Sequence, residues 1–238
     1  MIRSVTVKKK LLPPLVAEFL GSMLLVMSTI GSMIMFTVVL ESPKNVALLA
    51  NAIAVGFILA TLIEMFAPIS GSHFNPVVTM IMWLDKKIDS LQAVLFVVFQ
   101  ILGGIVGTIV THLMFFDEMG GILFVSDNVR NSSRYFSEFV ATFILLLVIL
   151  MLVKAKSDKT SLFIGLLVGG QIMATSSTIF ANPQVTIARI FTSAESGIRP
   201  VDGLVFLAMQ IVGALAAYGI YKIIFEQKEF VQTVDKKN

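Results

Sequence analysis

The sequence contains no cysteine and only two histidines, His73 and His112. Without cysteine the chain can form no disulfide, no thiolate metal site and no thiol nucleophile. Two histidines are too few for a metalloenzyme centre unless carboxylates help them. We therefore expect no enzyme, no cofactor and no metal site. The net charge of +3 comes without a basic patch interleaved with aromatic residues, which argues against nucleic-acid binding.

Charged residues are also scarce. They make up 14% of the 238 residues, whereas 56% are hydrophobic, and a soluble domain carries about a quarter charged residues. The apolar residues form runs of about 20, which is the length of a helix that crosses a bilayer. Arg3 and the lysines at 8–10 precede an apolar run that continues to Leu40, too long for the core of a cleaved signal peptide. The chain is predicted to be an integral membrane protein.

We predict an all-α membrane protein with six spanning helices and two re-entrant half-helices. Two further apolar stretches, 75–84 and 182–191, are long enough for only half a membrane. Cytoplasmic loops carry an excess of lysine and arginine, and most of the basic residues fall inside when both termini are cytoplasmic. The six predicted spans are 15–40, 46–66, 91–116, 135–153, 162–177 and 203–225.

The two halves of the chain repeat each other. "AEFLGS", with Glu18, is similar to "SEFVAT", with Glu138, and "FQILGG", with Gln100, is similar to "MQIVGA", with Gln210. The repeats cover about 11–116 and 135–225 of a single channel domain, 1–238. Because each repeat holds three spans, the second lies upside down relative to the first, a frequent plan in transporters and channels. We expect both glutamines to bond between helices.

An Asn-Pro-x-Val-Thr motif opens both half-length stretches, with Asn75-Pro76 in the first and Asn182-Pro183 in the second. Asparagine suits a helix cap, and proline suits the first helical position. The alternative is that both pairs cap ordinary surface helices. If the stretches instead enter from opposite sides, their N-termini meet in mid-bilayer, where non-helical backbone must be buried or line a cavity. Two helix N-termini repel cations and favour neutral, hydroxylated solutes, which predicts a neutral-solute pore.

These features together resemble the aquaporin and aquaglyceroporin family, also called major intrinsic proteins. The resemblance rests on the paired Asn-Pro motifs, the "SGSHFNPVVT" segment, the matching glutamates and the six spans. It implies a homotetramer in the lipid bilayer of the cell membrane, with one passive pore in each subunit. The family usually has alanine at the third motif position. Val77 and Gln184 stand there instead, and we expect them to keep the capping geometry but change the pore wall.

The family also places an arginine three residues after the second asparagine, at the narrowest point of the pore. Here that position is Val185. The resemblance assigns the other three filter positions to Val55, Gly170 and Ile179, so we expect an apolar, wide and poorly discriminating filter.

Arg189 follows Val185 by four residues, on the same face of the short helix. Helical side chains lean toward the helix N-terminus, which would bring the guanidinium of Arg189 toward the constriction. The alternatives are a salt bridge to Glu195 and snorkelling to water.

The segment "VTIARIFTSAESGIRP" resembles a prokaryotic branch of the family that is often encoded with arsenic-resistance genes and also lacks the filter arginine. The resemblance implies uncharged metalloid hydroxides such as arsenous acid as solutes, beside water, glycerol and similar polyols. A water-selective aquaporin is the alternative. An ion-coupled secondary transporter, which shares inverted repeats and broken helices, is a more distant one.

Four further polar residues fall in or near the membrane. Carboxylates in spans are costly and usually face the interior or a partner, so we expect Glu18 and Glu138 to accept hydrogen bonds from the re-entrant loops. Glu64 either snorkels to water or bonds the "APISGSH" loop. His73, two residues before Asn75, lines the inner vestibule or is held by loop backbone.

Overall fold

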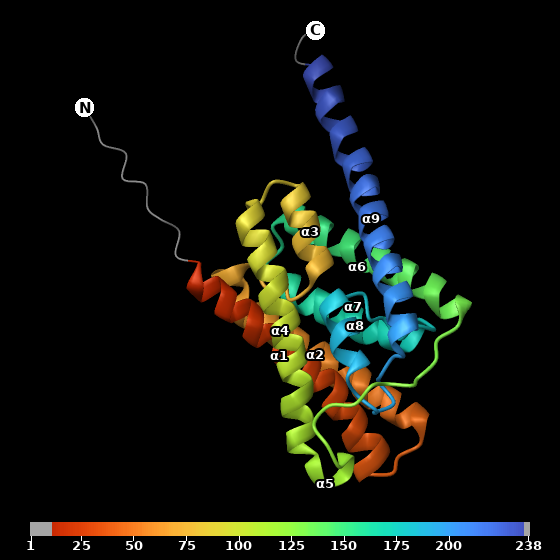
Figure 1. Ribbon diagram of the computed structural model, residues 1–238. Coiled ribbons are helices and arrows are strands. Elements are labelled where there is room, and N and C mark those ends of the chain that lie inside the picture. The colour runs from red at the N-terminus through yellow and green to blue at the C-terminus, as the bar shows by residue number, and fades with distance from the viewer. Residues whose placement is uncertain (1–10, 236–238) are drawn as a thin grey trace, which may run out of the picture.

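Helices make up the whole regular structure of the part of the chain that the computed structural model describes, which is 11–235, with side chains to Phe225 (Figure 1). The basic residues Arg3 and 8–10 lie outside this range. The predicted all-α fold class is confirmed. In chain order the elements are α1 (Leu12–Ile34), a π-helical turn η1 (Met35–Val39), α2 (Lys44–Ser70), α3 (Pro76–Leu84), α4 (Ser90–Met114), α5 (Phe116–Met119), α6 (Ser132–Ala155), α7 (Thr160–Ala174), α8 (Pro183–Ile190) and α9 (Pro200–Asp235).

Five helical spans are long and apolar enough to cross a membrane: α1 with η1, α2, α4, α6 and α9 as far as Phe225. The sixth predicted span is shorter than expected, because α7 has 15 residues, about 22 Å at 1.5 Å per residue. It ends where Thr175 turns extended (φ −115°, ψ 140°), and non-helical backbone continues from there to α8. At the other extreme, α9 continues past the predicted end at Phe225 to Asp235 and projects beyond the bundle (Figure 1).

The two half-length helices, α3 and α8, have nine and eight residues and reach about 12–14 Å, less than half of a bilayer with its headgroups. Each begins with proline, which lacks an N–H and has a helical φ, after an asparagine cap. Asn75 Oδ1 accepts a hydrogen bond from the Val77 N–H at 3.0 Å, and Asn182 Oδ1 accepts one from the Gln184 N–H at 3.1 Å. The Asn-Pro pair therefore starts both helices in the same way.

Glycines bring the long helices of each half close together. Gly103 of α4 lies against the carbonyl oxygen of Phe19 in α1, and Gly213 of α9 lies against that of Phe139 in α6. A β-carbon at either glycine would collide with the facing carbonyl oxygen. Small residues are a common means of close helix approach in membranes, and the same device serves the equivalent helix pairs of the two halves.

The outer surface of the bundle is apolar. Many large hydrophobic side chains are exposed there, among them Phe57 of α2 and Leu204 of α9, at 67% and 66%. Soluble proteins rarely expose continuous apolar surface of this extent. The surface fits a protein whose helices are surrounded by lipid, with its polar side chains directed inward.

Replacing Gly103 with alanine should destabilise the fold. The added methyl group meets backbone that cannot move aside, and overpacking of this kind costs about 1–3 kcal/mol of unfolding free energy. Gly219→Ala in α9 is the matched control, since no other atom lies near its β-carbon position and alanine favours helix over glycine. Thermal unfolding in detergent should show a lower midpoint for Gly103→Ala only. Equal midpoints for the two variants would show that the α1–α4 contact does not require glycine.

Candidate functional site

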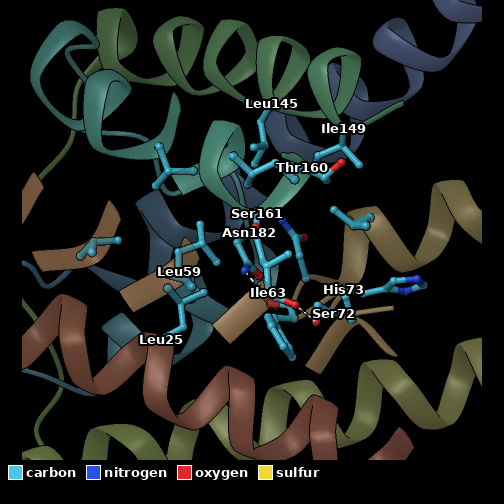
Figure 2. A pocket seen from close by; sticks show the side chains of 18 of the residues that line it. Leu25, Leu59, Ile63, Ser72, His73, Leu145, Ile149, Thr160, Ser161 and Asn182 are labelled. Carbon is cyan, nitrogen blue, oxygen red and sulfur yellow. Dashed lines mark hydrogen bonds between the residues drawn. The ribbon is translucent and has the colours of Figure 1, made fainter. Parts of the chain in front are cut away.

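A cavity of about 610 Å³ runs through the centre of the bundle (Figure 2). Its walls come from the long helices and from the two loops that precede α3 and α8. One end contacts Lys87, Ser157 and Asp158. The chain segments that supply these residues also carry the lysines at 86, 154, 156 and 159, so we call it the lysine-rich end. The other end contacts Asn51 and Arg189. Figure 2 shows apolar side chains from the long helices (Leu25, Leu59, Ile63, Leu145, Ile149). The polar side chains that it labels come from the first loop (Ser72, His73), the cap of α8 (Asn182) and the start of α7 (Thr160, Ser161).

Glu18 of α1 holds the first loop. Its side chain is fully buried, and its carboxylate accepts hydrogen bonds from the backbone N–H groups of His73 at 3.0 Å and Phe74 at 2.7 Å. The Ser70 hydroxyl and the Gln100 amide donate to the same carboxylate at 2.6 and 2.7 Å. Four donors therefore satisfy a carboxylate that would otherwise be costly at this depth.

Glu138 of α6 holds the second loop in the same way. It is also fully buried and accepts from the backbone N–H groups of Phe180, at 3.2 Å, and Ala181. The Gln210 amide donates to Glu138 at 2.8 Å and to the Thr186 hydroxyl at 2.7 Å. The equivalent glutamine of the first half likewise bonds both its glutamate and the threonine of its motif. The role of these threonines was not predicted, although both close the repeated motif.

The start of each half-helix is tied to the loop of the other. Asn75 Nδ2 donates to the Ala181 carbonyl, and Asn182 Nδ2 donates to the Phe74 carbonyl, both at 2.8 Å. Phe74 and Ala181 adopt left-handed backbone conformations, with φ of 47° and 45°. Such conformations cost about 1–3 kcal/mol in residues other than glycine, and here the buried carboxylates hold them. The two helix N-termini therefore meet at the cavity wall.

This meeting point presents hydrogen-bond donors and partial positive charge. Each asparagine amide carries two N–H groups, and the described residues accept only one from each of Asn75 and Asn182. Both residues line the cavity, so the second N–H is available there. Each helix N-terminus adds about half an elementary positive charge. The arrangement favours neutral molecules whose oxygen atoms accept hydrogen bonds, and it repels cations.

Three of the four predicted filter residues lie on the cavity: Val55 of α2, Ile179 of the second loop and Val185 of α8. Each is buried from the outer surface. All three side chains are apolar, and the structure brings Val55 to the same cavity as Ile179 and Val185, from which it is far away in the chain.

Gly170, the fourth predicted filter residue, is not on the cavity. It lies on an exposed face of α7, and a β-carbon at this position would meet no other atom. Val168 and Ile172 of the same helix line the cavity instead. The position that the resemblance assigns differs from the one that lines the cavity because the backbone between α7 and Asn182 is non-helical, so distance along the chain from Asn182 does not fix which face of α7 a residue occupies. Since each helical residue turns by about 100°, an error of two positions moves a side chain to the opposite face.

Val77 and Gln184 also lie away from the cavity, contrary to the expectation that they change the pore wall. Both are buried among the helices. The Gln184 amide donates to the Phe74 carbonyl at 3.2 Å, the oxygen that also accepts from Asn182. Gly104 leaves the space that the longer Gln184 side chain occupies. Gln184 thus supports the first loop, and neither residue forms part of the cavity wall.

His73 lines the cavity, and its backbone N–H is held by Glu18. Its Nδ1 lies 3.0 Å from the Thr79 hydroxyl, which accepts a hydrogen bond from Gln100. Among the described residues, His73 Nδ1 is the atom that can accept a hydrogen bond from the Thr79 hydroxyl. A neutral His73 therefore carries its proton on Nε2. His73 thus lies on the cavity, and its hydrogen bonds are with the Glu18 carboxylate and the Thr79 hydroxyl, not with loop backbone.

Glu64 and Arg189 each had more than one expected position. Glu64 accepts a hydrogen bond from the Ser161 hydroxyl of α7 at 2.5 Å, at the lysine-rich end of the cavity, and this partner was not predicted. Arg189 is buried and lines the cavity. Glu195 pairs with Lys44 at 2.8 Å, so the alternative of an Arg189–Glu195 salt bridge is wrong.

Membrane-length helices around a cavity, with two half-length helices meeting N-terminus to N-terminus on its wall, define a membrane channel for small solutes. The sequence model of the major intrinsic protein family matches residues 2–181. The chain belongs to this family of membrane channels, as its motifs indicated.

Individual relatives agree with this assignment. Aquaglyceroporin AqpS of Rhizobium meliloti (strain 1021) is 38% identical over 208 residues, which cover 87% of this chain and 88% of that protein. Human aquaporin-4 is 27% identical over 88% of this chain and 66% of its own length. The X-ray structure of the aquaglyceroporin from Plasmodium falciparum superposes with a TM-score of 0.73 and 20% identity, over 93% of this chain and 100% of the other. This last match shows the fold.

Replacing Glu18 with glutamine should destabilise the protein strongly. One carboxylate oxygen becomes an NH₂ group that faces N–H donors, so at least one buried donor loses its acceptor, at a cost of about 1–3 kcal/mol or more. Glu64→Gln is the matched control, because Glu64 is exposed and exposed substitutions usually change stability by less than about 0.5 kcal/mol. Thermal unfolding in detergent should separate the two. A Glu18→Gln protein as stable as Glu64→Gln would contradict the role assigned to the carboxylate.

Proposed function

We propose that this protein is a passive pore for small uncharged molecules: water, glycerol and similar polyols, and metalloid hydroxides such as arsenous acid. The observation that carries the proposal is the meeting of α3 and α8, with the Asn75 and Asn182 amides on the wall of the central cavity. Donors there bind the oxygen atoms of neutral solutes, while the helix ends repel cations. The similarity to an aquaglyceroporin supports glycerol as a solute.

The proposed selectivity filter is apolar and wide. It consists of Val55, Ile179 and Val185, with Ile172 as the contribution of α7 in place of Gly170. Ile172 is preferred to Val168 because it lies one turn closer to the end of α7. Without a charged side chain at Val185 the ring presents methyl groups to the solute, so the ring itself discriminates by size.

The proposed setting follows from the charge distribution and from the family. The lysine-rich end faces the cytoplasm, because cytoplasmic loops carry the excess of basic residues, and both termini lie on that side of the cell membrane. The inverted repeats 11–116 and 135–225 form one domain, and four copies assemble into a homotetramer with a pore in each. The protein performs no catalysis in this proposal.

Among the described residues, the carboxylates that line the cavity are Glu64 and Asp158, both at the lysine-rich end. An ion-coupled transporter would place an ionisable group near the middle of its pathway. The middle of this cavity instead carries two asparagine amides and the helix N-termini. This distribution favours passive flow over coupling to a proton or sodium gradient.

Stopped-flow light scattering on proteoliposomes tests the proposal. We expect water, glycerol, urea and arsenous acid each to cross the membrane of these proteoliposomes faster than that of protein-free vesicles. The rates should not depend on proton or sodium gradients. Passage of water with exclusion of every larger solute would establish a water-selective channel and overturn the wide filter. Uptake that requires an ion gradient would overturn the channel itself.

Replacing Val185 with arginine should narrow the filter. A long cationic side chain at the ring leaves less room for polyols than for water, so glycerol permeability should fall several-fold more than water permeability. Val185→Ile is the matched control, because it keeps the ring apolar and adds one methylene. If Val185→Arg reduces both permeabilities equally, Val185 does not line the constriction.

A further inference from the structure

Arg189 extends the line of side chains that α8 presents to the cavity. Asn182, Val185 and Arg189 are spaced by three and four residues, which places them on one face of the helix, and all three line the cavity. Since α8 begins at the meeting point of the half-helices, this face leads from the asparagine amides, past the apolar ring, to Arg189. A solute at the end opposite the lysine-rich end therefore meets a guanidinium group.

The guanidinium of Arg189 is held in one position. Its Nε–H donates a hydrogen bond to the Ser196 carbonyl, and its central carbon lies 3.4 Å from the centre of the Phe180 ring. A cation over an aromatic face is attracted by the ring, more strongly when it is shielded from water. The Phe180 ring is itself fixed by edge contact with Phe206 at 5.1 Å between ring centres. The Arg189 group is therefore positioned before any solute arrives.

The loop that supplies the Ser196 carbonyl is held at both sides. Its Ile198 N–H donates to the carbonyl of Arg189 at 3.1 Å. Glu195 forms a salt bridge to Lys44 at the start of α2, and Asn128 donates to the Ala194 carbonyl at 2.8 Å. These bonds leave the acceptor of Arg189 little freedom, so the orientation of the guanidinium depends on the folded loop as well as on α8.

Most of the donors of Arg189 are unused by the protein. Arginine has five N–H donors and no acceptor, and the Nε–H is the one that the described residues accept. The two Nη groups have no acceptor there and are not sealed in the interior. The buried carboxylate of Glu138 is already bonded to loop N–H groups and to Gln210. The charge of Arg189 thus has no ion-pair partner among the described residues.

We infer that Arg189 is the specificity-determining donor of this channel and that Phe180 is the residue that positions it. The inference rests on the proposed function. The Nη groups of Arg189 donate hydrogen bonds to the oxygen atoms of small uncharged molecules that carry two or more hydroxyl groups. These hydroxyls lose water against the methyl groups of Val55, Ile179 and Val185 and regain hydrogen bonds at Arg189. Cations are repelled by the same group.

The test compares glycerol and water permeability in proteoliposomes of the wild type and the Arg189→Leu variant. The glycerol-to-water ratio should fall by about tenfold, the effect of one lost hydrogen bond to a charged donor, whereas water retains neighbouring water molecules as partners. Arg134→Leu is the matched control, since Arg134 is only partly buried, at the start of α6, and does not line the cavity. Its ratio should equal that of the wild type.

Two further variants keep the inference testable if Arg189→Leu does not fold. Phe180→Leu keeps the guanidinium of Arg189 but removes the aromatic ring against which it packs. The glycerol-to-water ratio of this variant should fall less than that of Arg189→Leu. Arg189→Lys keeps the charge without the planar fork, and its ratio should lie between the wild type and Arg189→Leu. An unchanged ratio in folded variants, or an equal loss of both permeabilities, overturns the inference. A wild type that passes neither solute overturns the proposed function instead, so the two failures are distinguishable.

Discussion

A helix can begin in the middle of a membrane only if the non-helical backbone leading to it finds hydrogen-bond partners, since lipid provides none. Glu18 and Glu138 supply these partners from neighbouring helices, each accepting two backbone N–H groups of one re-entrant loop. The left-handed residues before each asparagine persist because these bonds hold them. The meeting of the half-helices, and with it the solute pathway, depends on this pair of buried acceptors.

The same arrangement decides the character of the pathway. Both carboxylates are turned toward loop backbone and are fully buried. They hold the loops that form the middle of the cavity wall, but their negative charge does not face the cavity. What it presents instead is the asparagine amides, the positive helix ends and the apolar side chains of the long helices. A charged solute finds no counter-ion in the middle, whereas a neutral hydroxylated one finds donors. Scaffold and selectivity thus arise from one set of bonds.

Some residues of the site could be assigned from the sequence, and others could not. The Asn-Pro caps and the matched glutamates were readable because each role depends on local chemistry: proline has no N–H, asparagine caps a helix, and a carboxylate in a span needs donors. Gly170 was misplaced, and α7 was expected to be longer, because both depended on the conformation of the non-helical segment after Ala174. Val77 and Gln184 were expected at the pore wall, although helix rotation turns them into the protein interior.

The sequence by itself determined the membrane class, the repeated halves, the two half-helices and the residues that begin them, because composition and local hydrogen-bonding capacity are properties of short segments. Only the tertiary structure decided which side chains share the cavity, which donor meets which acceptor across the halves, and where the Arg189 guanidinium lies. Those facts depend on the rotation of each helix and on contacts such as Asn75 with Ala181, between residues that are far apart in the chain.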